Sequence, residues 1–251
     1  MKSFVRLGAT LGLVSSTLMG ALLAFNPAAV ALTDDEIKET LQTVPVFTIT
    51  DANGSPLISA PDGEDGAAVT GIFISRADAE SFLAGLQQGN PDLAEQVRVV
   101  PVSLAEVYDI AVANQGDELD FVFVPMQNEV ETAVEILRED GEDISTDEFQ
   151  GVPLFIARST SGSGGYLTMQ QDDQEVIPVF FKQEELQTML DRLTQSQPAL
   201  AGSMDIQVIN LEGLISAMQS TDDPDFNQLL LIPPRETLDY VQSLQEQNQQ
   251  P

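Results

Sequence analysis

The residue types that most often carry catalysis are scarce in this chain. Its 251 residues include no histidine and no cysteine, which excludes Ser-His-Asp and Cys-His catalysis, histidine-ligated metal sites, disulfides and thiol chemistry. A serine–lysine dyad could use Lys182, but the sequence contains no Ser-x-x-Lys motif. The 40 acidic residues allow so many carboxylate pairs that no single pair stands out as an acid and base. We therefore predict that the protein is not an enzyme; the alternative, a carboxylate-dependent hydrolase, requires two acids with shifted pKa values in one cleft.

Three short segments partly resemble ligand-binding motifs. The glycine-rich segment 161–165 lacks both the Lys-Ser/Thr pair of a P-loop and the third glycine of a dinucleotide fingerprint, so it favours a hairpin turn. Asp51 and Asn53 begin like a calcium loop, but Pro56 and Asp62 stand at positions six and twelve, where an EF-hand needs Gly and Glu. Residues 62–66 could hold calcium weakly, but their composition favours a solvated acidic loop. We predict no cofactor and no metal site.

Apolar recognition is the remaining chemistry. Phenylalanines recur in segments with strand patterns, where packing in a core is the usual role. The alternative is a duplicated apolar groove for extended or unfolded polypeptide, rimmed by acids. On that hypothesis the candidate client-binding residues are Phe47, Phe73, Phe155, Phe180 and Phe181.

Hydrophobic periodicity predicts the elements that must position these rings. Residues 151–181 read as strand, glycine-rich turn, strand, polar turn and strand, and their apolar runs suit strands covered on both faces. Thr33 and a Ser103–Glu106 capping box predict two helix starts. In the first half of the chain, strands are expected at 44–50, 68–74, 97–102 and 119–124. In the second half, helices are expected near 183–193, 211–218 and 236–244.

The chain also divides into two similar halves. Val44-Pro-Val-Phe47 recurs as Val152-Pro-Leu-Phe155, at an offset of 108 positions (152 − 44). Six segments align in order at this offset or one position less, which is typical of a tandem duplication. We predict an α/β fold of two tandem pseudo-symmetric ββ(β)αβαβα units forming mixed sheets flanked by helices. Helix-joined strands are expected to pair in parallel, and prolines within strand patterns are expected at sheet rims or bulges.

The predicted organisation starts with a signal peptide. Lys2 and Arg6 precede an apolar run, and Ala29 and Ala31 supply the small residues that signal cleavage requires. This predicts export to the periplasm, with the thylakoid lumen as the alternative, and no other stretch is apolar enough to span a membrane. A net charge of −30 argues against nucleic acid as a partner. We expect a signal peptide (1–31), a first half (32–140), an acidic linker (141–149), a second half (150–244) and a polar tail (245–251). The two halves should pack as one globular unit.

Several segments together resemble the family of the twenty-two-kilodalton Tic protein, a chloroplast envelope import component with cyanobacterial periplasmic homologues. They are VPVFTITDANGSPL, VVPVSLAEVY, FVFVP, GVPLFIA and GGYLTMQQDDQEVIPVFF. The resemblance implies a pseudo-symmetric α/β fold with apolar pockets and no cofactor. It also implies a chaperone-like role in protein transport, and in cyanobacteria a role in outer-membrane biogenesis beside the Omp85-type assembly protein.

The leading functional hypothesis is an exported factor that shields apolar segments of translocating or outer-membrane proteins. Its partners would be unfolded polypeptides and an Omp85-type outer-membrane assembly protein. The alternative is a non-enzymatic docking or scaffold module that binds one folded partner of that Omp85 type.

Overall fold

The computed structural model describes residues 31–59, 68–114, 119–160, 164–198, 202–221 and 223–248. The predicted cleavage residue Ala29 and the acidic loop 62–66 lie outside these ranges, whereas Ala31 is the first described residue. Within these ranges no helix combines the length and the apolar character needed to cross a bilayer.

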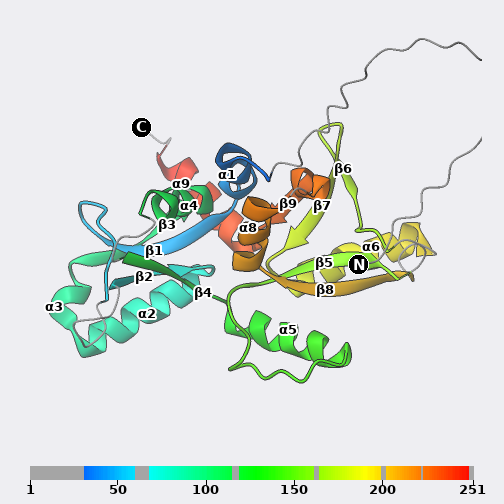
Figure 1. The fold of residues 1–251 in the computed structure, drawn as a ribbon. Helices are drawn as coiled ribbons and strands as arrows, with labels where there is room; N and C mark the ends of the chain where they lie inside the picture. Colours follow the sequence, from blue (N-terminus) through cyan, green and yellow to red (C-terminus); the bar gives the residue numbers. More distant parts are fainter. Residues whose placement is uncertain are drawn as a thin grey trace, which may run out of the picture.

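The chain folds into two sheets that lie side by side with helices between and around them (Figure 1). The elements of the first half are α1 (Asp34–Gln42), β1 (Pro45–Asp51), β2 (Ala68–Phe73), α2 (Arg76–Gly89), α3 (Pro91–Ala94), β3 (Val97–Ser103), α4 (Leu104–Ala113), β4 (Leu119–Val124) and α5 (Gln127–Glu139). Those of the second half are β5 (Pro153–Ser159), β6 (Met169–Gln171), β7 (Gln174–Phe180), α6 (Gln183–Ser196), β8 (Met204–Asn210), α8 (Leu211–Ser220), the short 3₁₀ helix η1 (Pro224–Gln228), β9 (Leu229–Ile232) and α9 (Arg235–Asn248).

Both sheets have the same strand order and the same pairing. The first runs β3-β1-β2-β4 and the second runs β8-β5-β7-β9, with β6 added against β7. The central strands β1 and β5 each pair antiparallel with two neighbours, whereas β2 pairs in parallel with β4 and β7 pairs in parallel with β9. Phe47 lies opposite Phe73, just as Phe155 lies opposite Phe180. The predicted pair of pseudo-symmetric mixed sheets is therefore confirmed.

One detail of the predicted topology was wrong. β3 follows β2 through α2 and α3, but it pairs with β1 rather than with β2, and β4 lies at the opposite edge. The same holds for β8 and β9 in the second sheet. The apolar strands β1 and β5 are buried over most of their length, and such burial is available only inside a sheet that is covered on both faces. They therefore occupy the place beside β2 and β7 that a helix-joined neighbour was expected to take.

The prolines mostly obey the predicted rule. Pro45 and Pro153 begin their strands, and Pro101 lies in the edge strand β3. Pro178 is the exception, because it lies inside β7, between β5 and β9. It stands where β7 changes partners, since the residues before it pair with β6 and those after it pair with β5. A change of partner tolerates a missing N–H better than a continuous ladder does.

The side chains that alternate along the strands build three cores. A central core lies between the two sheets and takes residues from both halves, including Val46, Leu104, Leu154 and Leu211. Phe47 and Phe73 belong to an outer core on the far face of the first sheet. The corresponding outer core of the second sheet contains Phe155, Ala157, Phe180, Leu186 and Leu190.

The last helix of each half covers the sheet of the other half. Ala133 of α5 packs with Phe155 on the second sheet, and Figure 1 shows α5 beneath β5 and β8. Tyr240 of α9 packs in turn on Phe47 of β1, with 6.0 Å between the ring centroids. The Arg76 guanidinium of α2 lies 3.9 Å from the Tyr240 ring centroid. The sequence boundary at 141–149 is therefore not a packing boundary.

Candidate functional site

All five predicted client-binding phenylalanines lie in the interior. Phe47, Phe155 and Phe181 are fully buried, and Phe73 and Phe180 are at most 6% exposed. Phe47 and Phe73 lie in one outer core and Phe155 and Phe180 in the other, whereas Phe181 lies in the central core. At these five positions the sheets are covered, so the rings meet other core side chains rather than solvent. In this conformation the five rings do not form a groove for a client, and their role is core packing.

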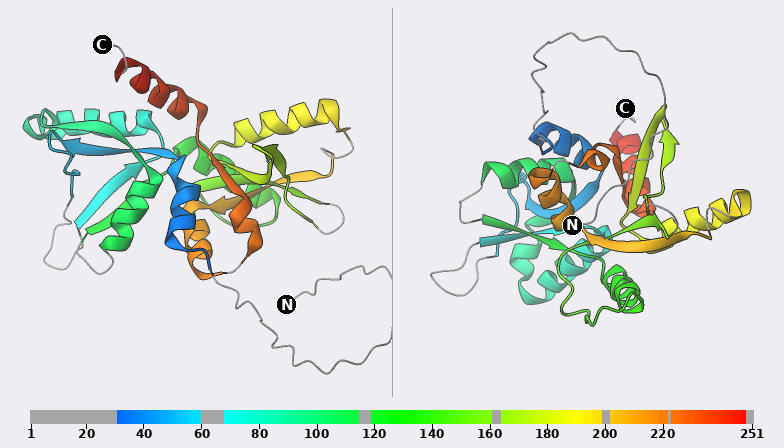
Figure 2. Two further views of the ribbon diagram at one scale, coloured as in Figure 1. Left: turned by 90° about the horizontal axis from the view of Figure 1, so that it is seen from above. Right: turned by 45° about the vertical axis from the view of Figure 1, so that its right-hand side comes forward.

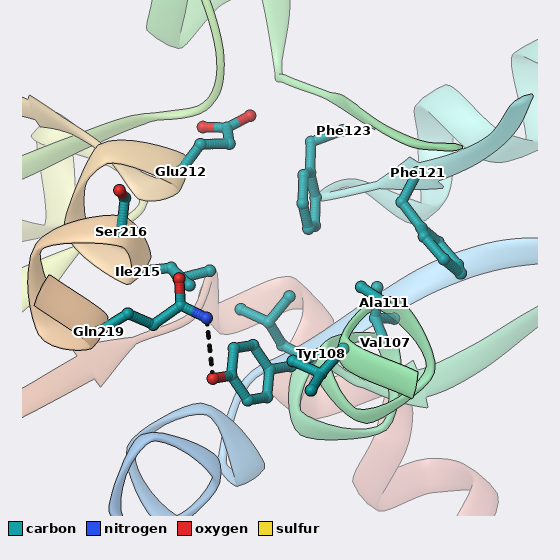
Figure 3. Close-up of a pocket in the computed structure, with 11 residues that line it drawn as sticks. Val107, Tyr108, Ala111, Phe121, Phe123, Glu212, Ile215, Ser216 and Gln219 are labelled. Atoms are coloured by element: carbon teal, nitrogen blue, oxygen red, sulfur yellow. Dashed lines mark hydrogen bonds between the residues drawn. The ribbon is translucent and has the colours of Figure 1, made fainter. Parts of the chain in front are cut away.

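An accessible apolar surface lies elsewhere, between the equivalent helices α4 and α8 and the edge strand β4. It is a pocket of about 300 Å³, which we call the α4–α8 pocket (Figure 3). Its lining residues are Leu104, Val107, Tyr108, Ala111, Val112, Phe121, Phe123, Glu212, Ile215, Ser216 and Gln219.

Local sequence explains how α4 presents its part of the pocket. Ser103 accepts a hydrogen bond from the Ala105 N–H at 3.0 Å, and Glu106 accepts one from the Ser103 N–H at 2.8 Å, so the helix begins at the predicted capping box. Apolar residues then recur at helical spacing, from Leu104 to Val112. The start of this stripe is buried in the central core, and its later part, at Ala111 and Val112, is half-buried and faces the pocket.

The opposite wall comes from α8 and the roof from β4. Asn210 caps α8 by accepting a hydrogen bond from the Gly213 N–H. The side chains of Phe121 and Phe123 project from alternate positions of β4 toward the helices, as Figure 3 shows. Val122 between them is 47% exposed and does not line the pocket. Because β4 is an edge strand, the pocket opens beside the sheet rather than within a closed core.

A hydrogen-bond chain closes one side of the pocket. The Tyr108 hydroxyl donates to Asp34 Oδ1 of α1 at 2.8 Å. It also accepts a hydrogen bond from Gln219 Nε2 of α8 at 3.0 Å, which Figure 3 marks with a dashed line. Burial is the main cause that raises the pKa of Tyr108 above its usual value. The hydroxyl therefore stays protonated at neutral pH and ties α1, α4 and α8 together.

Among the residues that the structure describes, Glu212 is the one charged member of the pocket lining. Its Oε2 atom accepts a hydrogen bond from the Val152 N–H at 3.0 Å, at the start of β5. Gly151 precedes that residue with a φ of +82°, and a Cβ there would collide with the Glu212 carboxylate. The carboxylate thus holds the start of β5 from its place at the rim of the pocket.

Glu129 is a second acid with a structural partner. It is 4% exposed, and its Oε2 atom accepts a hydrogen bond from the Gln183 N–H at 3.0 Å. Gln183 begins α6, whose own N-cap residue, Lys182, makes no side-chain cap. Burial raises the pKa of Glu129, while the bond from Gln183 and the charge of Lys182 act in the opposite direction. Glu129 therefore caps the neighbouring helix across the junction between the halves.

Sequence reasoning missed the pocket, although its signals were visible. The apolar spacing along α4 predicts one continuous face, but only the structure shows that this face leaves the core at Ala111 and Val112. Phe121 and Phe123 were interpreted as core residues, but they lie on an edge strand that only the sheet order reveals.

Comparison with known proteins places the chain in a family. The model of the Tic22-like family matches residues 1–246. A chloroplastic Tic22-like protein of Arabidopsis thaliana is 26% identical over 207 residues, which cover 81% of this chain and 62% of that protein. The chain thus spans less than two thirds of that relative's length. Chloroplastic Tic22 of Pisum sativum is 24% identical over 223 residues, covering 88% of this chain and 82% of that protein.

Solved structures show the same fold. Tic22 of Anabaena, a protein described by its role in protein transport, superposes with a TM-score of 0.73 at 26% identity and covers 84% of this chain and 97% of its own. Tic22 of Plasmodium falciparum superposes with a TM-score of 0.65 at 23% identity, covering 84% and 98%. Because the family model spans nearly the whole chain, this protein belongs to the Tic22-like family.

Proposed function

We propose that this protein is an exported, chaperone-like protein-transport factor that shields apolar segments of translocating or outer-membrane proteins. The observation that carries the proposal is the α4–α8 pocket, an open apolar surface built by rigid elements of the fold. Family membership and the protein-transport role of Anabaena Tic22 support the same reading.

The cellular setting belongs to the same proposal. We place the protein in the periplasm after cleavage of the predicted signal peptide, with the thylakoid lumen as the alternative compartment. Its clients would be outer-membrane proteins on their way to an Omp85-type assembly protein. The relatives named chloroplastic in plants fit a role in transport across an envelope.

The test is suppression of client aggregation. The protein beginning at Leu32 is mixed with a urea-unfolded outer-membrane β-barrel protein, and light scattering is followed after dilution at low and high salt. We expect suppression that survives high salt, because burial of apolar surface is not screened by ions. Suppression that salt abolishes would instead assign the activity to the acidic surface.

A matched pair of variants locates the activity. Ile215→Ser removes an apolar side chain from the pocket lining, whereas Ile110→Ser removes one that is 48% exposed on α4 outside the pocket. We expect Ile215→Ser to raise the concentration needed for half-suppression by about tenfold, as the loss of about 1.4 kcal/mol of binding would, and Ile110→Ser to leave it unchanged. Circular dichroism checks that both variants fold. No suppression by the unmodified protein would leave the docking-module function ahead.

A further inference from the structure

Helix α1 shows what kind of partner the α4–α8 pair holds. Its Ile37 and Leu41 side chains are fully buried in the central core. The Asp34 carboxylate accepts a hydrogen bond from the Tyr108 hydroxyl, and Lys38 Nζ lies 3.3 Å from Asp109 Oδ1 on α4. At its start the Leu32 N–H donates to the Met218 carbonyl of α8 at 3.1 Å. The helix therefore packs against α4, α8 and β9 together.

The internal repeat relates this surface, which we call the seat of α1, to the pocket. The duplication exchanges α4 with α8 and β9 with β4, at an offset of 107 or 108 positions. Applied to the residues that hold α1, it converts Tyr108 into Ile215, Asp109 into Ser216, Met218 into Ala111 and Leu229 into Phe121. All four resulting residues line the α4–α8 pocket. The pocket is thus the pseudo-symmetric counterpart of the surface that α1 occupies, and Figure 3 shows α1 and β4 on opposite sides of the helix pair.

The second half builds no helix for this position. The segment corresponding to α1 is 142–150, which forms a single turn at 146–148 instead of a helix. Ser145 donates from its backbone N–H and its hydroxyl to Glu148, as Thr33 does to Glu36 at the start of α1. Phe149 then packs on the outer core of the second sheet, away from the pocket. This cap lies four positions beyond the place that the offset of 108 gives for Thr33 (145 − 33 = 112), so a similar helix-start motif is present nearby and no helix follows it.

We infer that the α4–α8 pocket takes a short amphipathic helix from a client polypeptide, in the pose related to α1 by the internal repeat. This inference rests on the proposed function and names the form of client segment that the pocket recognises. A volume of about 300 Å³ is at the small end for ligand sites, and it suits two or three apolar side chains better than a long extended chain. The seat of α1 shows the matching pattern, which is apolar residues at i and i+4.

The charges around the pocket specify the polar face of the helix. Asp109 pairs with Lys38 of α1, but the repeat places Ser216 at the position equivalent to Asp109. The pocket therefore has no carboxylate at that position. Glu212 stands instead in the place of Ala105 and adds one carboxylate at the rim. With a net charge of −30 on the whole chain, a basic or neutral polar face is favoured over an acidic one.

The test uses two capped, fluorescein-labelled peptides of identical composition. Both contain Ile, Leu, Lys and Gln; the first places its apolar residues at i, i+4 and i+7, and the second alternates them as in a strand. We expect the first peptide to bind about tenfold more tightly by fluorescence anisotropy and to gain helical circular dichroism on binding, because so short a helix is marginal alone in water. Equal affinity for the two peptides would overturn the inference and leave a general apolar surface.

Two variants tie the binding to the pocket. Ala111→Trp fills the pocket, whereas Ala113→Trp adds the same ring on the exposed side of α4. We expect only Ala111→Trp to lower the affinity for the helical peptide, by about tenfold or more. Equal effects of the two variants would overturn the site, and a concentration-dependent dimer that only Ala111→Trp abolishes would assign the pocket to a second copy of the chain.

The two proposals fail separately. If the protein suppresses aggregation but does not distinguish the peptides, the proposed function stands and the helix inference falls. If the helical peptide binds but aggregation is not suppressed, the pocket is a helix-docking site and the shielding function falls.

Discussion

The two halves of this protein have sheets of the same strand order but differ in what covers the central core. In the first half, α1 packs along β9 and α8 and fills the space beside them (Figure 2). In the second half the corresponding segment is a turn, and the equivalent space beside β4 is the α4–α8 pocket. The comparison teaches that one helix decides whether a duplicated surface is core or binding site. Duplication supplied two equal seats, and only one of them is filled from within the chain.

The comparison also shows that the halves are not independent. Each outer core is closed by the terminal helix of the other half, α5 on the second sheet and α9 on the first. Glu129 of α5 also accepts a hydrogen bond from the Gln183 N–H at the start of α6, across the boundary between the halves. The halves should therefore unfold together.

The largest expected effect tests the equivalence of the outer cores. Phe47→Ala and Phe155→Ala each empty a fully buried site, so we expect each to lower the free energy of unfolding by about 3–5 kcal/mol. Chemical denaturation measures both. Phe82→Ala is the control, because that ring is 50% exposed and its loss should cost much less. A large difference between Phe47→Ala and Phe155→Ala would show that the two cores carry unequal stability despite equal registers.

An intermediate effect is expected where the halves meet. Glu129→Ala leaves the Gln183 N–H at the start of α6 without its carboxylate partner, at a cost of about 1–3 kcal/mol. Glu131→Ala on the exposed side of α5 should cost less than about 0.5 kcal/mol. Equal costs would mean that the cross-helix cap does not couple the halves.

The same residue predicts a dependence on pH. The pKa of Glu129 is raised in the folded protein, so the folded state holds its proton more tightly than the unfolded state does. This contribution to stability is fully present below the ordinary glutamate pKa and is lost as the pH rises through the raised value. The stability of the parent protein relative to Glu129→Gln should therefore decrease across that window, and thermal unfolding at a series of pH values measures it. A difference that increased with pH would contradict this sign.

The smallest expected effect concerns the seat of α1. Tyr108→Phe removes the hydroxyl that joins Asp34 and Gln219, with an expected cost of about 1 kcal/mol. Native-state hydrogen exchange of the variant, compared with the parent protein, should accelerate more in α1 than in α2, which does not contact this hydroxyl. Uniform acceleration in both helices would indicate a global loss of stability rather than a looser α1.

Sequence patterns predicted the elements well, because the signals are local. The helix starts at Thr33 and Ser103 were both predicted, and the repeat predicted two similar mixed sheets. The candidate site was not predicted, because hydrophobicity marks a phenylalanine as apolar without showing which face of which strand it occupies. Phe155 and Phe121 look alike in the sequence, yet one lies in a central strand and the other lies on an edge strand beside the pocket.

The sequence by itself determined the duplication, the α/β class and the scarcity of catalytic residue types, since these depend on composition and short-range spacing. Only the tertiary structure decided the exchange of α5 and α9 and the position of β4 at an edge. It also decided that α1 fills one of two equivalent seats while the other remains a pocket. The physical reason is that these features depend on contacts between residues far apart in the chain, whose free energy no local pattern records.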